Sequence, residues 1–379
     1  MRLALVGPVH PYRGGIAHYT TMLCEALRTR GHAVLMVSFK RQYPRWLFPG
    51  KSDRDPSAWQ VRVQDARYWI DSLNPLTWLQ TWLRIRRERP EAIVMQWWTP
   101  WWAPTWFVLG ALNRLSWRRP IFFVCHNVLP HEPRRWDRAV ARNVLGWGSQ
   151  FIVQSAEERA RLLDLLPGAR VTVFPLPVLD LFDGRRPDRG QARAHLGLDD
   201  DLPVLLFFGI VREYKGLRDL LAALPGIRAR LGHIQLLVAG EFWEDEGIYR
   251  AEMERLGIED LVRIDNRYIP NEEACLYFAA ADLLVAPYRR VTGSAVVRVA
   301  RAFGLPVLAT SVGGLAAAVA GGPTPVPPAD PRALEESIAA YLQDRMRQGR
   351  PAPTEPAQDP FSWPALIATL ERMAGEAER

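Results

Sequence analysis

Three stretches of the sequence place glycine, hydroxyl or basic side chains next to the start of a predicted helix, where an anion can bind. The first, "GPVHPYRGGIAHYT", has Gly14 and Gly15 between a predicted strand and a helix. Backbone amides at a helix amino terminus bind phosphate, and glycine allows a ligand to approach the backbone closely. An ordinary strand-to-helix turn explains this stretch equally well. It matches neither the GxGxxG dinucleotide fingerprint nor a Walker sequence, so neither of those sites is predicted.

The second stretch, "FFGIVREYKGLRDLL", carries two basic side chains in a loop. A predicted strand ends at Gly209 and a helix begins near Gly216, which leaves Arg212 and Lys215 between them. Arginine offers a planar fork and lysine a compact charge, and together they suit a diphosphate. The alternative is a solvated basic turn.

The third stretch, "PYRRVTGSAVVRVARAFGLPVLATSVGG", opens a helix with Thr292, Gly293 and Ser294. Free backbone amides and two hydroxyls at that amino terminus form a second candidate anion site. As a helix cap alone, either hydroxyl would be ordinary.

Short apolar runs alternate with longer amphipathic stretches, as in parallel α/β sheets whose strands are buried on both faces. Two such series predict two doubly wound domains facing across a cleft, with ligands at the carboxyl ends of the strands. The polar segment 178–203 predicts a linker with one short helix. The expected strands are 2–7, 33–39, 92–97, 121–126, 151–154 and 171–175 in the first domain, and 204–209, 234–240, 261–265, 282–287 and 305–310 in the second.

Charge is unevenly distributed along the chain. Its 379 residues carry a net charge of +7, but residues 1–177 hold 25 Lys/Arg against 12 Asp/Glu, and the rest hold 23 against 29. The amino-terminal half is therefore the one expected to meet an anionic partner. The sequence contains no basic run interleaved with aromatic residues of the kind that binds nucleic acid. Anionic lipid or a phosphorylated ligand is therefore the favoured partner.

The cysteines and the apolar runs bear on the cellular location. Cys24, Cys125 and Cys275 match neither a disulfide framework nor a metal-ligand spacing, which indicates a reducing cytoplasm. The amino-terminal apolar run stops at Gly7 and is too short for a signal peptide. The apolar stretch 97–112 contains two prolines and is too short to span a bilayer. We expect a cytoplasmic protein without a transmembrane helix.

The stretch "QWWTPWWAPTWF" holds five of the chain's 15 tryptophans within residues 97–106. A helical period places Trp98, Trp101 and Trp102 on one face. Burial of two or three of the five rings is the plain interpretation, but tryptophan is rarely fully buried. We expect Trp98, Trp101 and Trp102 on the acceptor or membrane side, because exposed rings beside arginines suit a membrane interface or the lipid end of an acceptor. These arginines are Arg84, Arg86, Arg87, Arg114, Arg118 and Arg119.

Several motifs occur in an order and spacing that resemble a known family. "FFGIVREYKG", "LLVAGEFWE", "RYIPNEEACLYFAAADLLVAPY" and "AFGLPVLATSVGG" resemble the carboxyl-terminal half of the family 4 retaining glycosyltransferases, whose fold is GT-B. "GPVHPYRGGIAHYT" and "FVCHNVLPHE" resemble the amino-terminal half, so the likeness covers nearly the whole chain. It implies an acceptor-side domain at 1–177 and a nucleotide-sugar-binding domain at 178–359. It also implies a final helix, within 360–379, that crosses back to the first domain.

The resemblance implies roles for the candidate residues. Arg212 and Lys215 would neutralise the diphosphate as it leaves, and Gly15 would approach the diphosphate and sugar. Tyr268 and Ile269 would border the base. The full set expected around the donor is Gly14, Gly15, Gly209, Glu241, Tyr268, Ile269, Thr292, Gly293 and Ser294.

Two candidates and one departure from the family pattern depend most on the resemblance. His126, at the end of "IFFVCH", matches a histidine near the transferred sugar, although a histidine ending an apolar strand is on its own more often structural. Glu241 has a comparable alternative, since a carboxylate after "LLVAG" can simply cap the turn. Val291 and Val299 stand where many members have two glutamates, the second of which commonly binds ribose. The chain therefore resembles a subgroup without this pair, or it has lost transferase activity.

The preferred hypothesis is sugar transfer from a nucleoside-diphosphate sugar to a hydroxyl of a glycan or lipid-linked saccharide, with retention, in polysaccharide or glycoconjugate synthesis. We expect no metal and no further cofactor, because Arg212 and Lys215 can neutralise the diphosphate and these loops contain no Asp-x-Asp motif. The alternatives are an epimerase or a glycogen-type phosphorylase of the same fold, and a non-catalytic nucleotide-sugar-binding protein. The expected location is the cytoplasm, with peripheral contact to the anionic inner face of the cell membrane and no contact with nucleic acid.

Overall fold

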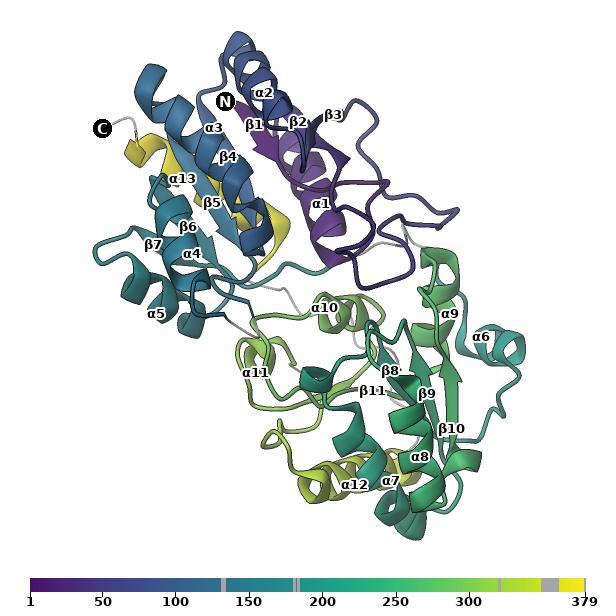
Figure 1. The fold of residues 1–379 in the computed structure, drawn as a ribbon. Helices are drawn as coiled ribbons and strands as arrows, with labels where there is room; N and C mark the ends of the chain where they lie inside the picture. Colours follow the sequence, from purple (N-terminus) through teal and green to yellow (C-terminus); the bar gives the residue numbers. More distant parts are fainter. Residues whose placement is uncertain (131–133, 180–181, 183–184, 320–321, 349–360, 378–379) are drawn as a thin grey trace. The chain divides into compact units, whose positions relative to one another are not determined.

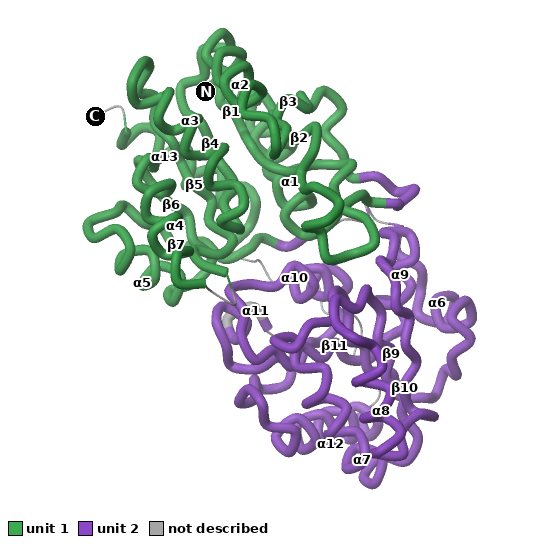
Figure 2. The backbone as a smooth tube through the Cα atoms, in the orientation of Figure 1, with its two compact units in different colours: residues 1–55, 61–177, 360–379 green, residues 56–60, 178–359 purple. Residues whose placement is uncertain are grey.

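The computed structural model describes the chain apart from residues 131–133, 180–181, 183–184, 320–321, 349–360 and 378–379. The chain divides into two compact units (Figure 2). Unit 1 comprises Met1–Asp55, Val61–Pro177 and Pro360–Arg379, and unit 2 comprises Pro56–Gln60 and Val178–Asp359. Each unit is built around a parallel sheet of its own.

Unit 1 contains a seven-stranded sheet in the order β3-β2-β1-β4-β5-β6-β7 (Figure 1). Leu3 of β1 pairs with Val34 of β2 on one side and with Ala92 of β4 on the other. The central strands are apolar runs buried on both faces, because helices cover both. The strands are β1 (Arg2–Val6), β2 (Ala33–Arg41), β3 (Arg67–Asp71), β4 (Ala92–Trp97), β5 (Ile121–Cys125), β6 (Gln150–Val153) and β7 (Val171–Val173).

The helices of unit 1 pack on the two faces of this sheet. One face is covered by α2 (Pro75–Glu88), α3 (Ala103–Ser116), α4 (Asp137–Leu145) and α5 (Ala156–Leu165), with the 3₁₀ turn η1 (Pro100–Trp102) before α3. The other face is covered by α1 (Gly15–Thr29) and α13 (Trp363–Ala377), the last helix of the chain. The backbone carbonyl of Met373 in α13 accepts a hydrogen bond from Nε2 of Gln150 in β6 (2.8 Å). The expected return of the final helix to the first sheet is confirmed (Figure 1).

Unit 2 contains a five-stranded sheet in the order β10-β9-β8-β11-β12. Its strands are β8 (Val204–Phe208), β9 (Gln235–Ala239), β10 (Val262–Asp265), β11 (Leu283–Ala286) and β12 (Val307–Ala309). The helices are α6 (Arg189–Leu196), α7 (Leu217–Leu231), α8 (Glu246–Leu256), α9 (Asn271–Ala280), α10 (Ala295–Ala302), α11 (Leu315–Ala318) and α12 (Pro331–Gln348), with 3₁₀ turns η2 (Glu213–Lys215) and η3 (Glu259–Leu261). Each strand expected from the sequence is present in the two sheets, with ends within two residues of the expected bounds.

The segment expected to be a linker, 178–203, contributes to the packing of unit 2 instead. Its helix α6 lies against α9, and Arg193 of α6 is fully buried. Arg193 donates through Nη2 to Asp282 Oδ2 (2.7 Å) and through its other nitrogens to the backbone carbonyls of Asp199, Asp200, Leu202 and Ala280. The segment was predicted as a linker because its composition is polar. It packs into unit 2 nevertheless, since backbone carbonyls and one carboxylate form hydrogen bonds with the buried Arg193.

The segment Pro56–Gln60 leaves unit 1 and packs on the start of α9 in unit 2. Oγ of Ser57 accepts a hydrogen bond from the backbone amide of Asn271 (2.9 Å). In return, the carboxylate of Glu272 accepts from the backbone amides of Ala58 (2.9 Å) and Trp59 (3.2 Å). A residue remote in sequence thus supplies the cap that α9 lacks locally.

Among the described residues, no helix has both the length and the apolar character needed to cross a bilayer.

Candidate active site

In both sheets the order of the strands reverses at one point, and several candidate residues follow the strands beside it. In unit 2 the chain runs from β8 outward to β9 and β10, then returns to β11 and β12, so the change falls between β8 and β11. In unit 1 it falls between β1 and β4. Open α/β sheets bind ligands outside the carboxyl ends of the strands at such a switch point. The loops after β8 and β11 are therefore the first place to look for chemistry.

Lys215 follows β8 and reaches the segment that follows β11. Its Nζ donates to the hydroxyl of Tyr288 (3.1 Å) and lies 4.3 Å from the centre of the Tyr288 ring. The same hydroxyl lies 3.4 Å from Oγ of Ser294, the N-cap of α10. Lys215, Tyr288 and Ser294 thus form a connected group at the switch point, here named the lysine cluster.

Lys215 retains its charge across the physiological pH range. Burial lowers the pKa of the ammonium, but the phenol groups of Tyr288 and Tyr214 raise it by more, so the pKa lies above its ordinary value. In the described part of the chain no carboxylate forms an ion pair with Lys215. A partly buried cation without an acidic partner is suited to bind an anionic ligand.

Two glycines allow the loop after β8 to lie close to its neighbours. Gly216 has a φ of 70°, and a Cβ there would lie 1.9 Å from the carbonyl oxygen of Pro287 at the end of β11. Gly209 has a φ of 100°, and a Cβ there would lie 3.4 Å from Cγ2 of Val296 in the first turn of α10. Any larger residue at position 216 would separate Lys215 from the β11 segment.

An ion pair between α7 and the loop after β11 lies next to the lysine cluster in sequence and constrains its position. Arg289 donates through Nε and Nη2 to the two carboxylate oxygens of Asp219 (2.8 and 2.7 Å). The backbone amide of Arg289 donates to the carbonyl of Tyr214 (2.7 Å). Because a bidentate pair constrains orientation as well as distance, it holds the residues on either side of Lys215 and Tyr288 in place.

Arg212 lies on the opposite side of β8, toward β9. Its guanidinium is 5.9 Å from the ring centres of both Tyr214 and Trp243. Nε1 of Trp243 donates to Oε2 of Glu241, a carboxylate that is buried after β9 (3.0 Å). The structure therefore brings Arg212 and Glu241 together through Trp243, and Glu241 has a partner that fixes its orientation.

The remaining donor-side candidates occupy the carboxyl edge of the same sheet. Thr292 and Ser294 are buried on either side of Gly293, and Oγ of Ser294 accepts from the backbone amide of Val297 (3.4 Å), so it caps α10. Tyr268 and Ile269 lie between β10 and α9. Because β9 lies between β10 and β8 in the sheet, these two residues follow a strand that is not adjacent to the switch point. Ile269 is buried.

In unit 1 the amino terminus of α1 follows the switch-point strand β1. Gly14 is its N-cap with a φ of 104°, and Gly15 is the first residue of the helix. No side chain caps this end, and the first turn contains no acidic residue. A Cβ at Gly14 would meet no atom within 4 Å, so the space before the helix is open on that side. The backbone amides of the first turn are therefore available to an anion.

His126 is held between two buried glutamines at the end of β5. One ring nitrogen, Nε2, lies 2.7 Å from Oε1 of Gln96, and Nδ1 lies 2.9 Å from Nε2 of Gln154. The hydroxyphenyl ring of Tyr19 meets the imidazole edge-on at 4.9 Å. Burial lowers the pKa of His126 to about 3. The imidazole is therefore neutral, with Nε2 protonated and donating to Gln96 while Nδ1 accepts from Gln154.

The prediction that Trp102 belongs to an exposed surface is wrong. Trp102 is 0% exposed and packs 4.1 Å from Phe39, and Trp97 and Trp106 are also fully buried. Trp98 and Trp101 are partly buried against the same core, and the indole of Trp98 donates to the hydroxyl of Tyr43 (2.9 Å). Most of this aromatic stretch is thus core, because Phe39 of β2 packs against Trp102 and Trp106, and Tyr43 packs against Trp102.

Three residues of these sites were not identified from the sequence, namely Tyr288, Gln96 and Gln154. Tyr288 and Gln154 follow a strand by one or two residues, and Gln96 is the second-last residue of β4. Parallel sheets place ligand-binding side chains near these strand ends, but that position alone does not distinguish the three residues. The rarity of lysine is a further sequence feature that points to Lys215. The chain has three lysines, Lys40, Lys51 and Lys215, among its 48 Lys and Arg residues. A lysine in an arginine-rich chain indicates a position that requires a compact ammonium group.

The described residues contain no group of three or more His, Cys, Asp or Glu side chains that could hold a metal ion. The positive charges at the candidate site come from Arg212, Lys215 and the amino terminus of α10.

Two tandem parallel sheets with a returning final helix define the GT-B fold of glycosyltransferases. Sucrose-phosphate synthase from Thermosynechococcus elongatus matches with a TM-score of 0.71 and 21% identity, over 99% of this chain and 98% of that chain. Anabaena HepE in complex with UDP and glucose matches with a TM-score of 0.70 and 17% identity, over 99% and 100%. At such identities the likeness shows the fold alone, and it confirms the predicted GT-B class.

Family models identify the group more narrowly. Residues 14–177 match the model described as "Glycosyl transferase 4-like domain", and residues 202–344 match "Glycosyl transferases group 1". The chain belongs to the family 4 glycosyltransferases, as its motifs predicted.

The curated relatives that match include several D-inositol 3-phosphate glycosyltransferases. D-inositol 3-phosphate glycosyltransferase 1 of Catenulispora acidiphila is 36% identical over 217 residues, which is 54% of this chain and 51% of that protein. The D-inositol 3-phosphate glycosyltransferase of Frankia alni is 34% identical over 48% of this chain and 46% of that protein. The one from Corynebacterium glutamicum is 28% identical over 71% and 69%. The chain spans about half the length of the first two of these relatives.

Proposed function

We propose that this protein transfers a sugar from a nucleoside-diphosphate sugar to an acceptor hydroxyl. The lysine cluster carries the proposal, because it presents an ammonium without a carboxylate partner beside a hydroxyl-capped helix amino terminus. Negative charge develops on the diphosphate as the bond to the anomeric carbon breaks, and preorganised positive groups stabilise it. The proposal is supported by family membership and by the HepE complexes with UDP and with UDP-glucose.

In this proposal the two units have different tasks. Unit 2 binds the donor, with Lys215 and Arg212 on the diphosphate and Thr292, Gly293 and Ser294 on phosphate or sugar. Glu241, Tyr268 and Ile269 contribute to the recognition of sugar and base, and Gly209 allows close approach. Unit 1 receives the acceptor, which we propose to be a saccharide or a lipid-linked saccharide.

In this proposal unit 1 also helps to bind the donor, through residues near its own switch point. Gly14 and Gly15 offer the amides of α1 to the donor diphosphate or sugar. His126 contributes as a neutral positioning residue, because both ring nitrogens already have glutamine partners. It is therefore not assigned the part of a proton acceptor.

Product analysis tests the proposal with the full-length protein. UDP-, GDP-, ADP- and dTDP-sugars are incubated with and without saccharide and lipid-linked acceptors, and released nucleoside diphosphate and glycosylated product are quantified. Acceptor-dependent release with a matching product is the expected result. Conversion of a donor into another sugar nucleotide without acceptor would establish an epimerase instead, and release of sugar 1-phosphate in inorganic phosphate would establish a phosphorylase.

Binding without turnover is the outcome expected of a non-catalytic nucleotide-sugar-binding protein. Val299, at the position of the ribose-binding glutamate of many family members, is buried in α10 and offers no polar atom. If this loss abolished catalysis, a nucleoside diphosphate would bind and no acceptor would be glycosylated. The anomeric configuration of any product, which we propose to be retained, is determined by proton NMR.

A further inference from the structure

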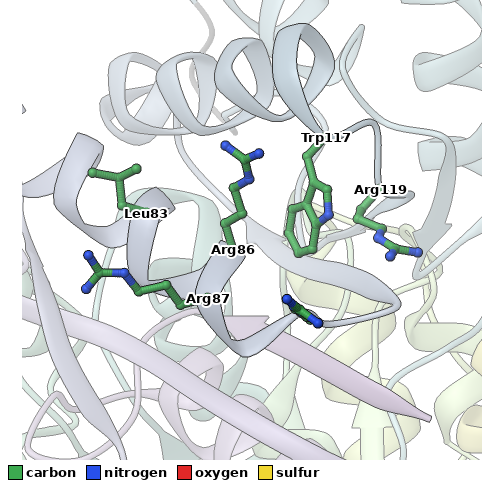
Figure 3. A pocket seen from close by; sticks show the side chains of 6 residues that line it. Leu83, Arg86, Arg87, Trp117 and Arg119 are labelled. Atoms are coloured by element: carbon green, nitrogen blue, oxygen red, sulfur yellow. The ribbon is translucent and has the colours of Figure 1, made fainter.

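A second basic site lies in unit 1, at the edge of the sheet away from the candidate active site. A concavity of about 710 Å³ is lined by Leu83, Arg86, Arg87, Arg89, Trp117 and Arg119, here named the arginine pocket (Figure 3). Its residues come from the end of α2 and from the segment after α3 (Figure 3). These segments lead into the first residues of β4 and β5, whereas Gln96 lies near the carboxyl end of β4 and His126 directly follows β5. The arginine pocket is thus distinct from the active-site edge.

The arginines around this pocket are not neutralised by the protein. Seven arginines lie at or near the ends of the two helices, namely Arg84, Arg86, Arg87, Arg89, Arg114, Arg118 and Arg119. In the part of the chain that the structure describes, none of them forms an ion pair with a carboxylate. The two carboxylates nearby in sequence are Glu88, which is exposed, and Glu91, which accepts from the backbone amide of Arg2 (3.2 Å). The surface therefore carries uncompensated positive charge.

Aromatic rings hold several of these guanidinium groups in place. The guanidinium carbon of Arg86 lies 5.4 Å from the ring centre of Trp82, and that of Arg119 lies 5.3 Å from the ring centre of Trp117. Arg84 is placed in the same way over Trp69 (5.1 Å). Such contacts restrict the side chains before any ligand binds and so reduce the entropy lost on binding.

Two of the arginines occupy backbone positions that favour glycine. Arg89 follows α2 with a φ of 49°, and Arg118 follows α3 with a φ of 59°. A left-handed conformation at the end of a helix is usually taken by glycine, since other residues meet a steric penalty there. An arginine at both positions is a choice that local backbone geometry does not explain.

An apolar stripe continues from the pocket along the exposed face of α2. Leu76, Leu79, Leu83 and Arg87 recur at spacings of three and four, which puts them on one face of the helix. All three leucines are exposed, and Leu76 is 68% exposed. On the adjacent helix α3, Leu115 is 81% exposed beside Arg114.

We propose that this surface binds an anionic phospholipid membrane. The arginine pocket accepts a lipid phosphate, and the leucine stripe of α2 enters the boundary between headgroups and acyl chains. Basic residues around an exposed apolar helix face are the chemistry of a helix lying in the membrane interface. A nucleic acid would match the charge but offers nothing to the leucines, and a soluble phosphate ester would leave them in water. Of these three occupants, the membrane alone matches both the charge and the leucines.

Vesicle sedimentation of the full-length protein tests this proposal. Phosphatidylcholine vesicles containing about one third phosphatidylglycerol should bind the protein at low salt, and pure phosphatidylcholine should not. Arg87→Gln/Arg119→Gln should lower the partition coefficient roughly 10- to 30-fold, because each basic group near an anionic surface contributes to binding. The matched control is Arg142→Gln/Arg159→Gln, which removes two exposed arginines from α4 and α5 and should keep wild-type binding.

A second pair of variants tests the leucine stripe. Leu76→Gln/Leu79→Gln should lower binding to the same vesicles several-fold, whereas Ile248→Gln/Met346→Gln, at exposed apolar positions of unit 2, should not. Arg89→Gly/Arg118→Gly should lower vesicle binding without lowering the melting temperature, because glycine suits the two left-handed positions. This variant separates a loss of binding from a loss of folding.

Several outcomes would overturn the proposal. They are absence of wild-type binding to the anionic vesicles, an equal loss in the Arg142/Arg159 control, and full binding by the leucine variant. Binding to duplex RNA or to free glycerophosphate that depends on Arg87 and Arg119, without binding to vesicles, would assign the pocket to those ligands instead. None of the substituted residues belongs to the proposed donor site, so failure here would leave the transferase proposal intact.

Discussion

At the scale of single residues, Lys215 is the side chain on which the proposed chemistry depends most. Lys215→Ala removes the ammonium that donates to Tyr288 (3.1 Å) and leaves the surrounding loop in place. We expect kcat/KM for the donor to fall roughly 10²- to 10³-fold, the usual cost of removing one group that stabilises charge in a transition state. Tyr288→Phe keeps the ring and removes only the hydroxyl, so its effect should be smaller. Both are measured by acceptor-dependent release of nucleoside diphosphate.

The matched control for this prediction is Lys40→Ala, which removes an exposed lysine from β2 in unit 1. It should leave the kinetics unchanged. If Lys215→Ala turned over donor as fast as the wild type, the assignment of the lysine cluster to the diphosphate would be wrong.

His126 predicts a dependence of stability on pH. Burial lowers the pKa of His126 in the folded protein to about 3, whereas in the unfolded chain the pKa stays near the ordinary histidine value of 6.5. Between these two values the unfolded chain binds a proton that the folded chain does not, so the free energy of unfolding falls as the pH falls. We expect His126 to account for a loss of about 2–3 kcal/mol between pH 7 and pH 4.5, since one pKa unit corresponds to about 1.4 kcal/mol.

Urea titrations of wild type and His126→Gln at both pH values measure this contribution. The variant is expected to be less stable at pH 7 but to lose less stability on acidification. The exposed His233→Gln serves as control and should keep the wild-type slope. An unchanged slope in His126→Gln would mean that the imidazole is already charged in the folded protein.

At the scale of elements, the contact between Pro56–Gln60 and α9 is the least expected feature. Ser57→Ala leaves the buried backbone amide of Asn271 without its acceptor. We expect the free energy of unfolding of unit 2 to fall by roughly 1–3 kcal/mol, the cost of a buried donor left unsatisfied. Hydrogen exchange at the start of α9 should become faster, although residue 57 lies in sequence between two parts of unit 1.

Ser52→Ala is the control for this element, because Ser52 is exposed and, among the described residues, its hydroxyl accepts one local hydrogen bond, from the amide of Arg54 (3.0 Å). Its effect should stay within about 0.5 kcal/mol, as at most surface positions. Equal effects of the two substitutions on unit 2 would show that the Ser57 contact does not stabilise α9.

The elements that could be predicted have a recognisable pattern in their own residues, whereas those that were missed depend on contacts with residues remote in sequence. Strand β5 is an unbroken apolar run and β4 is interrupted by Gln96 alone, so both can be recognised without knowledge of the neighbouring strands. By contrast β3 is an edge strand with exposed Arg67 and Tyr68, so it lacks both an apolar run and a clear alternation. The capping of α9 by Ser57 is a tertiary contact and has no local pattern at all.

The candidate site divides in the same way. Glycines and basic residues before helices identified the loops, because helix amino termini and their ligands leave a local pattern. The connection of Lys215 to Ser294 through Tyr288 could not be predicted, since it depends on β8 and β11 being neighbours in the sheet. Likewise, the helical spacing of the tryptophans suggested an exposed aromatic face. The packing of Phe39 against Trp102 shows that the centre of this stretch belongs to the core.

At the scale of the whole molecule, two units of similar plan carry opposite charge balances. Residues 1–177 are strongly basic and the remainder is acidic in balance. In our proposal the acidic unit binds the anionic donor, which requires positive charge concentrated locally, at Arg212, Lys215 and the start of α10. The basic half carries its surplus at the arginine pocket, on the other edge of its sheet from Gly14 and His126.

The central claim is that unit 2 binds the nucleoside diphosphate of a sugar donor through the lysine cluster. Thermal denaturation of wild type, Lys215→Ala and Lys40→Ala with UDP, GDP, ADP or dTDP tests it most directly, because a ligand that binds only the folded state raises apparent stability, by about 2.7 kcal/mol at a hundred times its Kd. We predict that at least one of these nucleotides raises the melting temperature of the wild type and of Lys40→Ala, and that the shift is largely lost in Lys215→Ala. No shift with any of the four, or an equal shift in all three proteins, would contradict the account.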